Sequence, residues 1–162
     1  MTRGTDGNMS REMRRKEKEM DISEAKVLLG DAEVGRLVMS LRDEPYVIPV
    51  NFVYFQDRVY FHCAREGQKI DYLSANPRVC FEVDEFLGVK PSRKPCSFGS
   101  KYRSVIVFGK AEFVENVDEK KLALRKLVEK YAKTYTSFDE DAFEKTMVVA
   151  IIVERLTGKK SV

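Results

Sequence analysis

Three apolar runs of strand length lie between Pro45 and Asp84, and they constrain the fold more than any other part of the sequence. Only residues 56–58 separate the first two runs, a spacing that is typical of a β-hairpin. A polar segment and one short helix precede the third run, which begins after Asn76 and a proline. This order predicts a chain that is organised around a β-sheet.

The rest of the chain adds strands and helices to this sheet. The pattern predicts six strands, at residues 35–41, 46–55, 59–63, 78–86, 102–115 and 147–156, with a bend or bulge at Gly109. It predicts helices at 21–30, 68–75 and 118–135, a helical turn at 139–145, a loop at 87–99 and a tail from 157. Sequential strands in a chain of this size favour a barrel, because closure removes exposed strand edges. We therefore expect a mainly β protein with flanking helices.

The longest predicted helix carries one apolar face, formed by Leu122, Leu124, Leu127, Val128 and Tyr131. Such a stripe at helical spacing predicts packing against the sheet.

Composition limits the classes of function. The 162 residues suit one domain, predicted at 21–162, after a charged lead segment at 1–20 whose MRRKEKEM stretch could become ordered against the body. Lys and Arg total 29 and Asp and Glu total 26, in alternation, which argues against a nucleic-acid partner. No apolar run approaches the roughly 18 residues of a membrane helix, so no membrane partner is expected. Three cysteines without paired spacing, Cys63, Cys80 and Cys96, predict reduced thiols and a cytoplasmic protein.

Pro49 and Asn51 interrupt an otherwise apolar strand. Proline has no N–H to give to a neighbouring strand, so a central, fully paired strand would exclude it. Two interpretations remain open: an edge strand or bulge, or a backbone that faces a planar ligand.

His62 is the chain's only histidine and precedes Cys63 in a predicted strand. Adjacent strand residues point to opposite faces, so this pair cannot act as a nucleophile and its base. The cysteines also lack the spacing of a zinc site, and no metal is predicted. His62 is then either a strand-end histidine bonded to the backbone or a donor to a bound ligand.

Two cation clusters suggest an anion site. Arg65 and Lys69 flank Gly67 at a predicted helix start, where free N–H groups and the helix dipole favour an anion. Residues 102–105 supply a further cation and a hydroxyl at the start of a strand. Solvated surface charges are the alternative for each cluster alone, whereas two clusters beside one sheet favour a shared anion site.

At these residues the sequence resembles a known family. The ordered segments are PYVIPVNFVY, RVYFHCAREGQKIDYL, NPRVCFEVD, YRSVIVFGKAEFVE and the terminal TGK. Together they resemble the pyridoxamine 5′-phosphate oxidase-like flavoproteins, and within them the nitroimidazole-reductase (Nim) type. The resemblance spans about Met13 to Lys159. It implies a split β-barrel that binds FMN non-covalently at a homodimer interface, with both subunits contributing to each flavin.

The resemblance also assigns roles to residues. It implies that Pro49, Val50 and Asn51 lie beside the isoalloxazine ring. It implies that His62, Cys63 and Ala64 lie near the ribityl phosphate, that Lys69 is the phosphate cation, and that His62 is close to the flavin. It implies that Tyr102, Arg103, Ser104 and Val105 form the second strand along the cofactor. The arginine-rich phosphate motif of pyridoxamine phosphate oxidases is not evident, so vitamin B6 oxidation is not expected.

The expected function is that of an FMN-dependent oxidoreductase that takes electrons from a reduced nicotinamide or another donor. The resemblance suggests a nitroaromatic such as a nitroimidazole as the small oxidant, with His62 as the candidate catalytic residue. A cofactor that performs the redox chemistry also explains the scarcity of other catalytic side chains. Two alternatives remain: a flavin-binding sensor or storage module without turnover, and a related barrel that binds haem or a deazaflavin.

Overall fold

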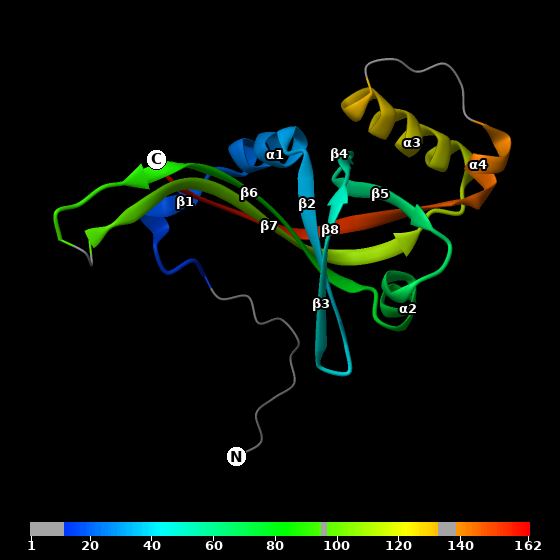
Figure 1. Ribbon diagram of the computed structural model, residues 1–162, viewed down its shortest axis with the longest axis horizontal. Helices are drawn as coiled ribbons and strands as arrows, with labels where there is room; N and C mark the ends of the chain where they lie inside the picture. Colours follow the sequence, from blue (N-terminus) through cyan, green and yellow to red (C-terminus); the bar gives the residue numbers. More distant parts are fainter. Residues whose placement is uncertain (1–11, 95–96, 133–138) are drawn as a thin grey trace.

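The protein is built around one antiparallel β-sheet, seen in a computed structural model that describes residues 12–94, 97–132 and 139–162 (Figure 1). Eight strands lie within these residues: β1 (Glu19–Met20), β2 (Val34–Leu41), β3 (Glu44–Asn51), β4 (Val53–Phe55), β5 (Arg58–Ala64), β6 (Arg78–Lys90), β7 (Gly99–Phe113) and β8 (Thr146–Ser161). The same residues form a 3-10 turn (Lys16–Lys18) and the helices α1 (Ile22–Asp31), α2 (Gln68–Ala75), α3 (Val117–Tyr131) and α4 (Glu140–Lys145). The mainly β fold with flanking helices is thereby confirmed.

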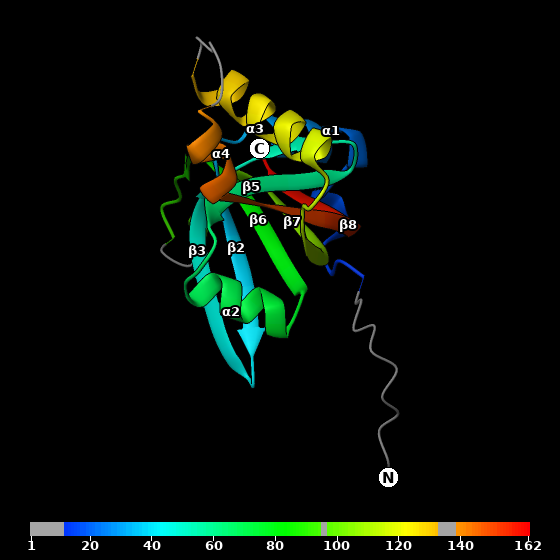
Figure 2. The ribbon, with the colours of Figure 1, turned by 90° about the vertical axis from the view of Figure 1, so that its right-hand side faces the viewer.

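The sheet curls into a barrel that stays open on one side. Its strand order is β3-β2-β6-β7-β8-β5-β4, with β1 paired to the end of β8. Among the described residues β3 pairs only with β2, so its other edge has no strand partner. β3 and β4 follow one another in the chain but stand at opposite ends of this strand order. The short link between them therefore brings the two ends of the sheet together at one corner, and the barrel is split beside β3. Figure 2 shows β3 at the margin of the sheet, with α2 across the lower part of β2 and β3.

The strand predicted at 46–55 is two strands in the structure. β3 ends at Asn51, and β4 begins at Val53 after one residue outside the ladder, Phe52. Only β4 pairs with β5, across a tight turn whose two residues have positive φ. The predicted hairpin is therefore confirmed for β4 alone, because β3 pairs with β2 instead. The break is hidden in the sequence because Phe52 is an apolar residue that a continuous strand could equally contain.

Two other segments are more ordered than predicted. The loop predicted at 87–99 is shorter, since β6 continues through Lys90 and β7 begins at Gly99. Figure 1 shows this hairpin extending beyond the barrel near the C-terminus. The tail predicted from 157 is also strand, since β8 continues to Ser161 by pairing with β1 and with the start of β7. Residues 95–96 and 133–138, which include Cys96 and the end of the predicted 118–135 helix, lie outside the described residues.

The remaining predictions of elements agree with the structure. Asp21 caps α1 by accepting a hydrogen bond from the Ser23 N–H, and Asn116 caps α3 in the same way through the Glu119 N–H. The lead segment touches the body where β1 pairs with β8 and where Lys18 Nζ lies 3.2 Å from Ser161 Oγ. No helix in the described residues is long and apolar enough to cross a bilayer.

Two hydrophobic clusters hold the fold together. The larger fills the barrel and includes Phe52 and Phe81, whose rings meet edge to face with centroids 4.8 Å apart. The smaller lies between α3 and the outer faces of β4, β5 and β8, and its members are Val53, Tyr60, Ala123, Leu124, Leu127, Val148 and Ala150. Because α3 packs on β5 from outside, the polar residues at the end of β5 lie beside this helix.

The pairing of β7 with β8 slips at Gly109, which confirms the predicted bulge. A Cβ on Gly109 would overlap the Ile152 carbonyl oxygen, so the two strands would have to separate. We predict that Gly109→Ala lowers the free energy of unfolding by about 1–3 kcal/mol.

Urea denaturation measures this change, and Gly30→Ala is the matched control. Gly30 lies within α1, and no heavy atom lies within 4 Å of the position that an alanine methyl group would take, so alanine there should be neutral or stabilising. Equal unfolding midpoints for Gly109→Ala and the wild type would contradict this account of the bulge.

Candidate functional site

The split beside β3 displays two of the residues that the sequence singles out. Strand alternation turns Pro49 and Asn51 outward, and both are exposed, whereas Val50 turns inward and packs against the barrel core. Pro49 lies on an edge strand, as one of its two predicted interpretations requires. The free edge of β3 also leaves backbone groups for a ligand, as the second interpretation requires.

The corner after β3 is fastened by α3. Phe52 is fully buried outside the ladder, and the Tyr131 hydroxyl accepts its N–H at 2.9 Å. The same hydroxyl is within donating distance of two carbonyl oxygens. Its oxygen lies 2.6 Å from the Glu33 oxygen and 2.9 Å from the Phe52 oxygen. Lys130 Nζ donates to the Ala32 carbonyl at 2.6 Å and lies 4.2 Å from the centre of the Phe52 ring, and burial lowers its pKa. The corner therefore depends on the last turn of α3.

His62 and Asn51 line one pocket of about 260 Å³ between β3, β5 and α3. The helix contributes Leu124, Leu127, Val128, Tyr131 and, just beyond its end, Ala132. His62 is exposed and its imidazole has no hydrogen-bond partner among the described residues, so the predicted bond to the backbone is absent there. The imidazole is thus available to a ligand.

Cys63 faces the opposite way, as predicted for a strand neighbour of His62. It packs into the barrel core, and burial raises the pKa of its thiol while nearby Lys69 partly opposes that rise. The side chain of Cys63 therefore has no access to the pocket, and a ligand would meet only its main chain. Ala64, the last residue of β5, is exposed.

The start of α2 has the features of an anion site. Gly67 precedes the helix with φ of 116°, a conformation that favours glycine, and no side chain caps the helix. No heavy atom lies within 4 Å of the position that a Cβ on Gly67 would take, and no described side chain accepts from the first N–H groups of α2. Lys69 makes no ion pair with any described residue, whereas Arg65 donates to the Glu144 carbonyl at 2.8 Å. Lys69 is thus the available cation at this helix start.

The second predicted cluster, Tyr102, Arg103, Ser104 and Val105, lies elsewhere in the chain. Arg103 donates to the Glu85 carboxylate at 2.8 Å in a separate pocket of about 610 Å³ that also includes Arg36 and Asp84. The side chain of Val105 is fully buried in the barrel core.

The pairing with β8 measures how far apart the two clusters are. His62 pairs with Val148 of β8, and Ser104 pairs with Lys159 of the same strand. Val148 and Lys159 are eleven positions apart, which is roughly 36 Å along an extended strand. One chain therefore does not bring the two clusters into one anion site.

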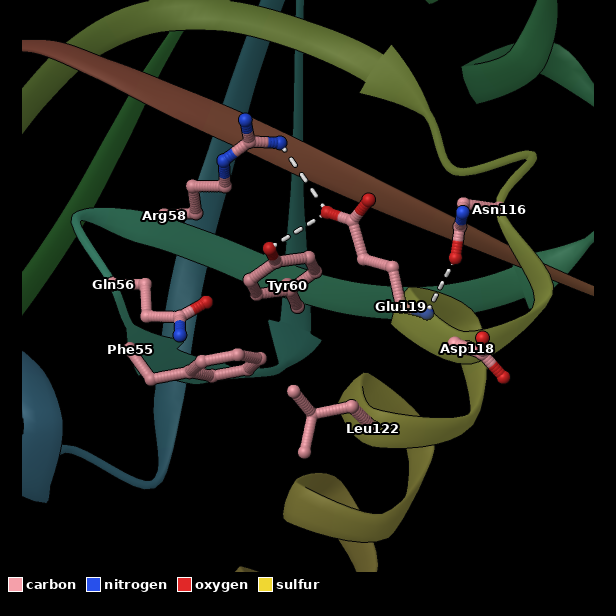
Figure 3. Close-up of a pocket in the computed structure, with 8 residues that line it drawn as sticks. All are labelled: Phe55, Gln56, Arg58, Tyr60, Asn116, Asp118, Glu119 and Leu122. Carbon is pink, nitrogen blue, oxygen red and sulfur yellow. Dashed lines mark hydrogen bonds and ion pairs between the residues drawn. The ribbon is translucent and has the colours of Figure 1, made fainter.

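A third pocket, of about 490 Å³, lies at the other end of α3 (Figure 3). Glu119 Oε1 accepts hydrogen bonds from Tyr60 at 2.8 Å and Arg58 at 3.3 Å, and the Phe55 ring stacks on Tyr60 with centroids 4.5 Å apart. Burial, followed by the hydrogen bond to Glu119, raises the pKa of Tyr60 to about 12. These polar groups satisfy one another, so the cluster serves to attach α3 to β5.

Sequence reasoning missed the contribution of α3 to the His62 pocket. The sequence predicts Leu124, Leu127, Val128 and Tyr131 only as an apolar packing face, and two of them, Leu124 and Leu127, do pack in the second core. Their additional role as a pocket wall follows from where β3 and β5 pass beneath the helix, which helical periodicity alone does not specify. Among the described residues no group of three or more His, Cys, Asp or Glu side chains is arranged to hold a metal.

Comparisons with known proteins agree with this architecture. A family model described as pyridoxamine 5′-phosphate oxidase matches residues 21–160. A candidate 5-nitroimidazole antibiotic resistance protein from Bacteroides thetaiotaomicron is 31% identical, with a TM-score of 0.76 over 87% of this chain and 85% of that one. An uncharacterised curated protein from Rhizobium meliloti, RA0666, is 26% identical over 91 residues, 56% of this chain. Because the match covers 53% of that relative, it extends over only about half of its length.

Two more distant structures share the fold. The flavocytochrome Anf3 from Azotobacter vinelandii has a TM-score of 0.80 at 22% identity, over 93% of this chain and 72% of that one. The FAD and haem binding protein from Mycobacterium smegmatis has a TM-score of 0.79 at 19% identity, over 89% and 73%. At these identities the likeness extends to the fold alone.

Proposed function

The chain belongs to the pyridoxamine 5′-phosphate oxidase family, and on this premise we propose that it is an FMN-dependent oxidoreductase that reduces a small oxidant such as a nitroaromatic. The observation that carries the proposal is the free edge of β3, which has the His62–Asn51 pocket at one end. The name of the Bacteroides relative, at 31% identity, supports a nitroimidazole as the kind of oxidant.

The residues present fit a flavin with a single phosphate. The open start of α2 offers N–H groups, and Lys69 offers a positive charge without a partner in the described chain. Pro49 and Asn51 would lie beside the ring, and His62, Ala64 and the main chain of Cys63 near the ribityl chain. Bound FMN would supply two-electron transfer from a reduced nicotinamide or another donor to the oxidant.

His62 is the candidate for substrate contact. Its imidazole is exposed in the pocket and can donate a hydrogen bond or a proton to a reducible group. The Asn51 amide, in the same pocket, can hold a second polar substituent. The sequence contains no dinucleotide-binding glycine motif, so a nicotinamide donor would bind transiently at this site.

A second copy of the chain would complete the site. Tyr102, Arg103, Ser104 and the main chain of Val105 lie apart from His62 in one chain, so they would contact the flavin of a partner, with Arg103 still bonded to Glu85. Exposed apolar side chains on the outer face of the sheet, Val34, Val47 and Ile106, also favour burial against another copy. We therefore include a homodimer in the proposal, with a cytoplasmic location expected from the reduced thiols.

The first test is the absorption spectrum of the purified protein and the mass of its released cofactor. Flavin bands and the mass of FMN support the proposal, whereas the mass of FAD changes the cofactor and a Soret band overturns the flavin assignment in favour of haem. NAD(P)H-driven reduction of a nitroimidazole then tests the reaction. No turnover with any donor would favour the sensor or storage module.

We predict that His62→Gln lowers kcat/KM for nitroimidazole reduction by about tenfold or more, since a proton donor typically contributes at least this much. Flavin content should remain at the wild-type level, because Lys69 and the start of α2 are unchanged. Steady-state kinetics and the flavin-to-protein absorbance ratio measure both quantities. An unchanged kcat/KM would remove His62 from the reaction.

We predict that Lys69→Ala weakens FMN binding by about tenfold or more, because a charge-assisted hydrogen bond contributes about 1.5–3 kcal/mol. Riboflavin, which lacks the phosphate, should bind wild type and variant equally. Fluorescence titration of the apoprotein measures both affinities. Lys26→Ala is the control, since Lys26 pairs with Asp57 at 2.7 Å on another surface. Parallel losses for FMN and riboflavin would contradict a phosphate contact.

We predict that Lys69→Ala and Arg103→Ala, each assayed at an FMN concentration too low to load it, restore activity when they are unfolded and refolded together. If each flavin site uses Lys69 of one chain and Arg103 of the other, random pairing leaves about a quarter of the sites intact. Activity of the mixture, compared with each variant refolded alone, measures this recovery. No recovery from a dimeric mixture would contradict a shared site, and a monomer in analytical ultracentrifugation would contradict the dimer.

A further inference from the structure

The pocket of His62 and Asn51 has an unusual division of chemistry between its walls. The strands supply its imidazole and its amide, and α3 supplies three aliphatic side chains, Leu124, Leu127 and Val128. None of the described residues that line it is Lys, Arg, Asp or Glu. An anionic ligand would therefore lose hydration without meeting a lysine or arginine, and His62 offers it a countercharge only when protonated, whereas an uncharged ring would find apolar contact and two polar partners.

The size of the pocket restricts its ligand further. Its volume of about 260 Å³ is below the roughly 300–1,000 Å³ of pockets that hold drug-sized ligands. A single substituted ring is the appropriate size. The strands that form the polar wall are fixed by pairing with β2 and β8, so the helix is the wall that sets the width.

That helical wall is tied to the strand that carries Asn51. The Tyr131 hydroxyl bonds both the N–H and the C=O of Phe52, the residue after Asn51, and also reaches the Glu33 carbonyl. Lys130 adds its bond to the Ala32 carbonyl. Tyr131 thereby couples the position of the aliphatic wall to the position of the Asn51 amide.

We propose that the C-terminal half of α3 is the substrate-selecting wall of this pocket, that it admits small uncharged aromatic molecules, and that Tyr131 is its positioning residue. The proposal rests on the proposed function, because the selected molecule is the oxidant of that reaction. It assigns no role to α3 in holding the flavin phosphate, which would lie at the start of α2. Substitutions in the wall should therefore change substrate binding and leave flavin affinity unchanged.

A binding test needs no turnover, because His62 is the only histidine of the chain. Protein with isotope-labelled histidine and no affinity tag, as purified with its cofactor, gives one imidazole signal set that reports on the pocket. The probes are 4-nitrobenzyl alcohol and 4-nitrobenzoate, which are similar in size but differ in charge. The alcohol should shift the His62 signals to saturation, and the benzoate should bind about tenfold or more weakly. Equal affinities would overturn the selection by charge.

Val128→Phe tests the wall, with Leu122→Phe as the matched control. Both add a ring to α3, but Leu122 lines the separate pocket at the other end of the helix. Val128→Phe should lower the affinity for 4-nitrobenzyl alcohol by about tenfold or more, because the added ring takes up space in the pocket. Leu122→Phe should leave that affinity unchanged. Equal affinities of Val128→Phe and the wild type for the alcohol would contradict the proposal that α3 selects the substrate.

Tyr131→Phe tests positioning, with Tyr54→Phe as its control. Tyr131→Phe removes the hydroxyl and keeps the ring, so KM should rise by up to about tenfold while kcat and flavin affinity change little. Tyr54→Phe also loses one hydroxyl hydrogen bond, to Asp57 at 2.6 Å, and should change none of these quantities. A fall in kcat with unchanged KM would overturn the positioning role of Tyr131.

Failure of the two proposals can be told apart. If Val128→Phe turns over substrate with the wild-type KM, the proposal that α3 selects the substrate is wrong, and the proposed oxidoreductase function still holds. If the alcohol binds saturably but is not reduced with any electron donor, the proposed oxidoreductase function is wrong. The preference of the pocket for an uncharged ring is then that of a binding module.

Discussion

The buried corner at Phe52 is the constraint on which the rest of the molecule depends. At this residue the chain leaves the β2–β3 ladder to join β5, and its peptide groups lose their strand partners inside the protein. A buried peptide group without a hydrogen bond destabilises a fold by about 1–3 kcal/mol. The hydroxyl of Tyr131 meets both groups, so a helix some eighty residues later makes the corner possible. The same contact fixes the end of α3 beside Asn51 and His62.

The charged residues divide into those that stabilise the fold and those that remain available. Glu119 binds Arg58 and Tyr60, Glu85 binds Arg103, and Arg36 bonds both Glu82 and Asp84. Most of these pairs are partly exposed, so each adds modestly to stability, but together they neutralise much of the surface. Within the described residues, Lys69 and His62 have no such partners. His62 lies in the pocket beside the end of β3 and Lys69 lies at the start of α2, where a ligand could satisfy them.

The sequence predicts the local elements well and their pairing less well. Asp21 is a recognisable helix cap, and Gly109 marks its bulge, because each effect acts within a few residues. The break at Phe52 escapes detection because its cause, Tyr131, is distant in the chain. The extension of β8 to Ser161 escapes for the same reason, since Gly158 and Lys159 become strand through their pairing with β1 and with the start of β7. Of the site, the outward direction of Asn51 and His62 follows from strand alternation, whereas the wall from α3 and the separation of Arg103 from Lys69 need the tertiary structure.

The long strand β8 has a consequence for the order in which the protein can fold. It pairs with β1, β5 and β7, and so joins the two halves of the sheet. Without residues 146–161, β5 keeps only the three-residue β4 as a partner, and β7 has one unpaired edge. During synthesis on the ribosome the barrel therefore cannot close until this last strand has emerged. Until then the edges of β5 and β7 that β8 covers stay open, so pairing with β8 is the step that completes the sheet.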